Sequence, residues 1–255
     1  MRKQIVSWLG VGVLSLMTAG ASAQGVYSLG DAAYLETGCG GPSPCDCAVF
    51  VVGPLGGTFE LTRVGTSGSF DVFAISNFDG VLGAMGPLPV VTPITGSGTY
   101  RVDAAAGVHG IELNLIVGQT PQTFVSVGDV PGGELFPDGV LISAYRELQP
   151  GGCEYDGIHL IAGLTQRAFQ RGDCNNDANR NVADPVFLLG LLFGPTDPLA
   201  ACDDACDAND DGTLNIADAV FLLTALFGGG VLPAPTTCGV DPTNDVLDCS
   251  AYSGC

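Results

Sequence analysis

Residues 206–220 read CDANDDGTLNIADAV, a stretch that carries an oxygen-bearing side chain at nearly every second residue and then turns apolar. Calcium takes six to eight oxygen ligands, and an EF-hand loop supplies them from positions 1, 3, 5, 7, 9 and 12, with glycine at position 6. Gly212 stands at that sixth position. The spacing predicts a Ca²⁺ site with these ligands: Asp207, Asn209, Asp211, Thr213 through its backbone carbonyl, Asn215 and Asp218.

A second copy of this pattern lies earlier in the chain. Residues 172–194, GDCNNDANRNVADPVFLLGLLFG, match residues 206–228, CDANDDGTLNIADAVFLLTALFG, so that Asp207 follows Asp173 by 34 residues. An internal duplication predicts two structural units of the same design. The copy supplies a second set of oxygen ligands: Asp173, Asn175, Asp177, Asn179, Asn181 and Asp184.

Two positions of the first loop depart from the calcium-loop pattern. Ala178 stands at position 6, where the loop needs a left-handed backbone, and a Cβ atom there costs about 1 kcal/mol or more. Arg180 stands at position 8, which in the second loop is the apolar Leu214. We therefore expect the first site to bind calcium more weakly than the second.

The N-terminus and the cysteines indicate an exported protein. Residues 1–23 have a positive start, an apolar run from Ile5 to Met17 and an A-x-A-like end, which together are typical of a cleaved signal peptide. The run is too short for a membrane span. All ten cysteines follow it, and an even number in an exported chain predicts disulfide bonds. The expected location is secreted, either extracellular or at the cell surface, with the periplasm as an alternative.

The cysteines also divide the chain. Four lie before residue 160 and six after residue 170, so each half should pair within itself. Zinc is the competing interpretation, but the chain has no C-x-x-C and only two histidines. Disulfide bonds within two separate domains are therefore the expectation.

The charge of the chain excludes whole classes of partner. It has 8 basic and 27 acidic residues, a net charge of −19. Such a surface repels nucleic acid and anionic membranes and attracts divalent cations.

Residues 24–165 have the pattern of a β domain. The segments 58–62 and 111–115 alternate apolar and polar side chains, as a strand with one buried face does. About eight such short runs, separated by Gly- and Pro-rich turns, predict a mainly β fold, an antiparallel β-sandwich or barrel. Periodicity does not choose between the two.

The residues after 165 have a different pattern. Each predicted loop leads into one apolar helix, residues 185–193 and 219–227, and neither has room for a good entering helix before it. Residues 166–230 are therefore expected to form a small α domain of paired loop–helix units. Residues 231–255 should form a Cys-rich C-terminal cap whose acids, including Asp241 and Asp245, are solvated.

Two loop–helix units with Asp at position 12, in an exported chain, resemble the type I dockerin module over about residues 170–230. The closer resemblance is to dockerin-like regions of secreted planctomycete proteins, whose Cys-rich ending extends the match to Cys255. The resemblance implies that calcium in both loops folds the module. It also implies that the module docks onto a cohesin-like or other surface or scaffold protein, commonly while carrying a polysaccharide-degrading enzyme.

The partner surface departs from the dockerin pattern. Cohesin-binding dockerins typically have Ser-Thr-like residues at loop positions 10 and 11, where this chain has Val182-Ala183 and Ile216-Ala217. Both helices are apolar nearly all round. They could pack on each other and on the β domain, or part of this face could receive a partner.

No catalytic motif is recognisable in the β domain. The histidines, His109 and His159, are expected to be surface residues, because no nucleophile stands in a motif such as G-x-S-x-G. We therefore expect a secreted, calcium-binding attachment protein with a non-catalytic β domain. The alternative is an extracellular hydrolase component of polysaccharide breakdown, with unrecognised catalytic carboxylates in that domain.

Overall fold

The computed structural model describes residues 25–40, 45, 48–83, 91–149, 152–194, 200–243 and 245–255. The predicted signal peptide, residues 1–23, lies outside these ranges. The elements in chain order are β1 (Gly25–Leu29), β2 (Tyr34–Cys39), β3 (Phe50–Ser67), β4 (Phe70–Gly83), β5 (Val91–Asp103), β6 (Val108–Val117), β7 (Thr120–Val125), β8 (Val130–Pro131), the 3₁₀ turn η1 (Gly133–Leu135), β9 (Gly139–Glu147), β10 (Glu154–Arg167), α1 (Ala183–Phe193), α2 (Asp203–Cys206) and α3 (Ile216–Phe227).

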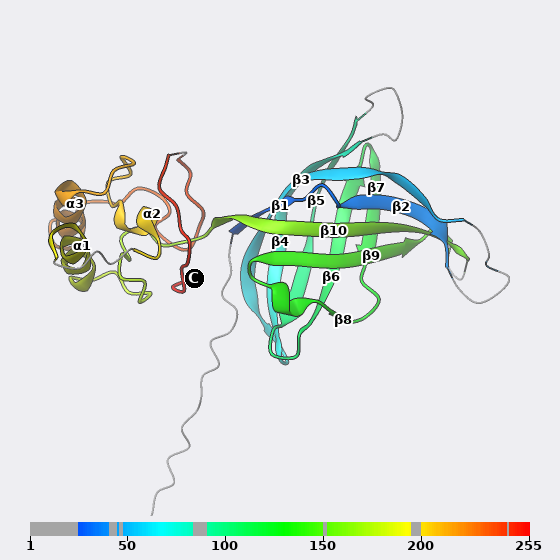
Figure 1. The fold of residues 1–255 in the computed structure, drawn as a ribbon, viewed down its shortest axis with the longest axis horizontal. Helices are drawn as coiled ribbons and strands as arrows, with labels where there is room; N and C mark the ends of the chain where they lie inside the picture. The colour runs from blue at the N-terminus through cyan, green and yellow to red at the C-terminus, as the bar shows by residue number, and fades with distance from the viewer. Residues whose placement is uncertain are drawn as a thin grey trace, which may run out of the picture.

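The strands form one antiparallel sheet that closes on itself (Figure 1). Its order is β1-β10-β2-β3-β4-β5-β6-β7-β9, and β9 pairs again with β10 along nearly its whole length. Strands β7 and β9 meet where Val125 faces Tyr145. The β domain is therefore a barrel rather than a sandwich of two sheets.

The interior of the barrel is built by alternation along each strand. On β6, Ile111, Leu113 and Leu115 are buried, whereas Glu112 and Asn114 between them are exposed, as the sequence predicts. Removing these apolar side chains from water is the main driving force for closing the sheet.

The prediction that His109 is a surface residue was wrong. His109 is fully buried, and its Nδ1 atom lies 2.9 Å from the hydroxyl oxygen of Tyr100. It shares the inward parity of Ile111 and Leu113 on β6, so the alternation itself directs it into the core. Burial lowers the pKa of His109.

The two long helices pack against each other at one end of the molecule, beyond the end of β10 (Figure 1). Both begin two or three residues earlier than the sequence predicts, because the cap of each helix lies inside the preceding loop. A single helical turn, α2, precedes the second loop and was not predicted. Among the described residues, none of the helices has the length and apolar character needed to cross a lipid bilayer.

The disulfide bonds of the described residues stay within the two halves of the chain, as expected. One joins the β domain's Cys45 to Cys153. The others lie after residue 170: Cys174–Cys206, Cys202–Cys249 and Cys238–Cys255.

Candidate metal centre

The second loop folds around the carboxylate of its first residue, Asp207. Asp207 Oδ1 accepts a hydrogen bond from the amide of Asp211 at 3.2 Å, and Oδ2 accepts one from the amide of Gly212 at 2.8 Å. Gly212 has a φ of 74°, the left-handed conformation that glycine adopts without a steric cost. The chain therefore turns at position 6, where the spacing predicts it.

The last residue of the loop, Asp218, ties its end back to its middle. Asp218 Oδ2 accepts a hydrogen bond from the amide of Asn215 at 2.9 Å, and Oδ1 accepts one from the amide of Asn209 at 3.4 Å. The side chain of Asn215 in turn accepts from the amide of Ala217 at 2.7 Å. This is a capping box, so the same residues that close the loop also start α3.

The first loop repeats this arrangement. Asp173 accepts hydrogen bonds from the amides of Asp177 at 3.1 Å and Ala178 at 3.0 Å. Asp184 accepts from the amide of Asn175 at 3.3 Å. Ala178 has a φ of 65°, so the loop keeps its left-handed turn although the residue carries a Cβ atom. The first loop therefore has the backbone strain that a residue with a Cβ atom is expected to cause at position 6.

The structure brings the predicted ligand residues together in two groups, one per loop. The first and last residues of each loop, Asp173, Asp184, Asp207 and Asp218, have no exposed surface. The other predicted ligands lie between them: Asn175, Asp177, Asn179 and Asn181 in the first loop, and Asn209, Asp211, Thr213 and Asn215 in the second.

The burial of these carboxylates has an electrostatic cost. Burial raises the pKa of Asp184, and burial together with the neighbouring Asp207 carboxylate raises the pKa of Asp218. Among the salt bridges of the described residues, none reaches any of the four buried carboxylates. A hard divalent cation would offset this charge, and carboxylate, amide and carbonyl oxygens are the ligands that calcium prefers. The donor set therefore fits calcium.

A disulfide bond holds the two loops side by side. Cys174, the second residue of the first loop, is joined to Cys206, the residue before the second loop. Both are buried with Leu188 of α1 and Ala219 of α3 in a small apolar core behind the loops. The geometry of one loop is thereby coupled to the geometry of the other.

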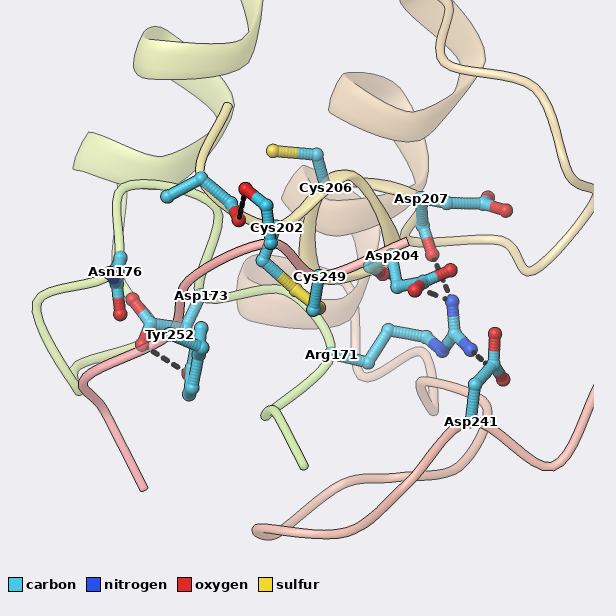
Figure 2. The surroundings of a disulfide bond; sticks show 12 residues. Arg171, Asp173, Asn176, Cys202, Asp204, Cys206, Asp207, Asp241, Cys249 and Tyr252 are labelled. Carbon is cyan, nitrogen blue, oxygen red and sulfur yellow. Dashed lines mark hydrogen bonds and ion pairs between the residues drawn. A yellow bond between two sulfur atoms is a disulfide. The ribbon is translucent and has the colours of Figure 1, made fainter. Parts of the chain in front are cut away.

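The C-terminal segment covers the first loop (Figure 2). The hydroxyl of Tyr252 donates a hydrogen bond to Oδ2 of Asp173, and the amide of Ser253 donates to Oδ1 of Asn176 at 2.7 Å. Burial and the Asp173 carboxylate raise the pKa of Tyr252, so its hydroxyl stays protonated. The sequence predicts a cap here, but not this contact with the first ligand residue of a loop.

The same segment also contacts the second loop at an equivalent place. Thr243 Oγ1 donates to Asp210 Oδ1 at 2.8 Å. Asp210 and Asn176 occupy position 4 of their loops, and each has a φ of 60°. One terminal segment therefore holds the same corner of both loops.

Arg171 is the basic residue at the centre of this region (Figure 2), and the sequence did not single it out. It is fully buried; its Nη1 donates to the backbone oxygens of Asp204 and Asp207, and its Nη2 lies 2.8 Å from Asp241 Oδ1 and 2.9 Å from Asp210 Oδ1. An arginine directly before an acidic loop was the available signal. It holds α2, the second loop and the C-terminal segment together.

A second group of polar side chains lies on the outer face of the barrel. Ser143 on β9 and His159 on β10 are directly opposite, with Ser143 Oγ 2.7 Å from His159 Nδ1. The other ring nitrogen, Nε2, lies 3.1 Å from Oε1 of the buried Glu36 on β2. The ring of Tyr34 stacks on the imidazole at 4.3 Å. A cavity of about 360 Å³ lies beside Ser143 and His159.

Comparison with known proteins returned no similarity: no protein-family model matches the chain, and neither curated proteins nor solved structures match it.

Proposed function

We propose that this chain is an exported calcium-binding protein whose dockerin-like paired loop–helix module attaches its β-barrel to an extracellular assembly or to the cell surface. The observation that carries the proposal is the repeat of one loop geometry with two fully buried carboxylates in each copy. Such loops are strongly destabilised by their own charge without a cation. Calcium would supply that charge, and its binding would be coupled to folding of the module.

The helices support attachment to a protein partner. Their exposed apolar residues fall at equivalent positions: Val186 and Phe193 on α1 are 63% and 70% exposed, and Val220 and Phe227 on α3 are 57% and 74% exposed. Large apolar side chains that repeat on one surface are typical of protein interfaces. Val182 and Ile216, which take the place of polar residues of a typical cohesin-binding dockerin, are exposed as well, so the expected partner surface is cohesin-like but more apolar.

The four described disulfide bonds support an exported location, because such bonds persist in oxidising compartments.

Calcium binding is tested first by calorimetric titration of the full chain. Asp207→Ala with Asp218→Ala should remove the second site, and Asp173→Ala should weaken the first. Wild-type protein that takes up no calcium at millimolar concentration would end the proposal.

Attachment is tested by binding of the purified protein to the envelope of the producing cell, with calcium and with chelator. Replacing Phe193 and Phe227 with Ser should abolish calcium-dependent binding. The matched control is Leu141→Ser, an exposed apolar change on the barrel, which should leave binding intact. Equal binding by both variants would refute a docking role for the helices.

A second candidate function is hydrolysis by the β domain, which the group on its outer face favours. A nucleophile within hydrogen-bond reach of a base, which a third residue orients, is the structural signature of covalent catalysis. In this hypothesis Ser143 attacks an ester carbonyl carbon while His159 takes the hydroxyl proton and passes it to the leaving alcohol. Water then releases the acid by the same route, and Glu36 orients the imidazole throughout. Acyl esters on polysaccharides would suit an exported protein.

Labelling with a fluorophosphonate probe separates the two candidates. The hydrolase hypothesis requires covalent modification of Ser143 and turnover of acetylated polysaccharide, both lost in Ser143→Ala and in His159→Gln. An unlabelled wild-type protein would leave the attachment function alone.

A further inference from the structure

A cavity of about 220 Å³ lies where the end of β10, the short helix α2 and the C-terminal segment meet. Asp204 of α2 lines it together with Asp241 and Asp245, and the carboxylate oxygens of these three residues all lie within 4.8 Å of one another. The three come from segments almost 40 residues apart in the chain. The cavity adjoins the second loop, since carboxylate oxygens of Asp245 and Asp207 lie within 4.8 Å of each other, but none of its three carboxylates belongs to the predicted ligands of either loop.

Asp204 points to a missing ligand. Its side chain is 6% exposed, and its Oδ1 atom is buried without a hydrogen-bond partner among the described residues. Burying a carboxylate oxygen without a hydrogen-bond partner destabilises the folded state by roughly several kcal/mol, so native structures rarely contain one. The other two carboxylates at the cavity add negative charge beside it.

The basic residues near the cavity form an ion pair with only one of its three carboxylates, that of Asp241. Arg171 pairs with Asp241 and with Asp210, and its remaining nitrogens donate to backbone oxygens. Arg167, which also lines the cavity, pairs with Asp138. Among the salt bridges of the described residues, none includes Asp204.

We propose that this cavity is a third cation site, which binds calcium through the carboxylates of Asp204, Asp241 and Asp245. A set of oxygen ligands without sulfur or imidazole selects a hard cation. Calcium tolerates ligands from several segments and irregular geometry, whereas Mg²⁺ demands a near-ideal octahedron. The bound ion would join the C-terminal cap to α2, beside the end of the barrel's last strand.

The test counts calcium ions bound to the full, disulfide-intact chain by native mass spectrometry during a titration with CaCl₂. Asp204→Asn keeps the shape of the side chain but removes its charge, and it should lose one ion relative to wild type. Asp203→Asn is the matched control, since it changes the neighbouring acid on the same helix, which does not line the cavity, and it should lose none. Equal stoichiometry in all three proteins would overturn the proposal.

Thermal unfolding gives a second readout that does not depend on counting ions. Asp204→Asn should gain less in melting temperature from calcium than wild type does, because one site is missing. A gain equal to that of wild type would contradict the third site.

The experiments can refute the loop sites and the cavity site independently of each other. Asp207→Ala with Asp218→Ala removes ligands from the second loop only. If that variant binds as much calcium as wild type while Asp204→Asn binds less, the cavity site stands and the loop proposal falls. If the loop variant loses an ion and Asp204→Asn does not, the loops bind calcium and the cavity does not.

Discussion

Two single substitutions at position 6 of the loops, Ala178→Gly and Gly212→Ala, should change the stability of the module in opposite directions. Ala178 and Gly212 have nearly the same left-handed backbone, with φ of 65° and 74°. An L-residue in this conformation costs about 1–2 kcal/mol, whereas glycine costs nothing there. The greater freedom of glycine in the unfolded chain returns about 0.4–1 kcal/mol of that difference. Ala178→Gly should therefore stabilise the module by about 1 kcal/mol or less.

The reverse change should destabilise by more than the exchange of backbone strain alone. A Cβ atom at Gly212 would lie 3.2 Å from the Cβ of Asp245, a contact tighter than ordinary packing allows. Gly212→Ala therefore adds a steric cost to a loss of about 1 kcal/mol from strain. The C-terminal segment would have to shift to relieve the contact.

Scanning calorimetry in saturating calcium measures both effects on the full chain. A change of about 1 kcal/mol in the free energy of unfolding shifts the melting temperature of a domain of roughly 60–100 residues, the size of this module, by about 4–8 °C. The control is Gly190→Ala in the middle of α1, where an added Cβ meets no atom within 4 Å and should raise stability through helix propensity. Shifts of the same sign at Ala178 and Gly212 would refute the argument from the left-handed turn.

Three further outcomes are expected. Leu188→Ala empties the core between the helices and should cost about 2–5 kcal/mol by denaturant unfolding, whereas Val186→Ala on the exposed face of the same helix should cost less than about 0.5 kcal/mol. Arg171→Met leaves buried carboxylates without their cation and should destabilise by about 3–5 kcal/mol, measured in the same way; a loss under 1 kcal/mol would contradict its central role. Burial lowers the pKa of His109, so the folded barrel binds fewer protons than the unfolded chain as pH falls below the ordinary histidine pKa of 6.5. The free energy of unfolding of the barrel should therefore decrease as the pH is lowered below 6.5, and this decrease should be smaller in His109→Gln.

The sequence was most informative where structure is local. The ligands of each loop lie within twelve residues, so their spacing alone was enough to predict the left-handed turn at Gly212. The starts of the helices were less accurate, because Asn215 serves both as a loop residue and as the cap of α3. The spacing pattern assigns Asn215 to the loop alone, whereas in the structure it is both a loop residue and the N-cap of α3.

Alternation along β6 predicted which side chains point inward. Extending the same alternation back from Ile111 by two residues places His109 in the core as well. Closure of the sheet was not predictable, since it depends on β9 pairing with β10 and on one contact between Val125 and Tyr145. Sandwiches and barrels share the same period of two along their strands, and only the long-range pairing distinguishes them.

The sequence by itself determined the two loops, the apolar helices after them and the β character of the first half, because each follows from residues close together in the chain. Only the tertiary structure decided what these parts face. Arg171 meets Asp241, Asp204 meets Asp245, and Ser143 meets His159 and Glu36 because folding brings distant segments together. Acids and histidines of this kind have no local pattern, so their chemistry depends on neighbours that a linear sequence does not specify.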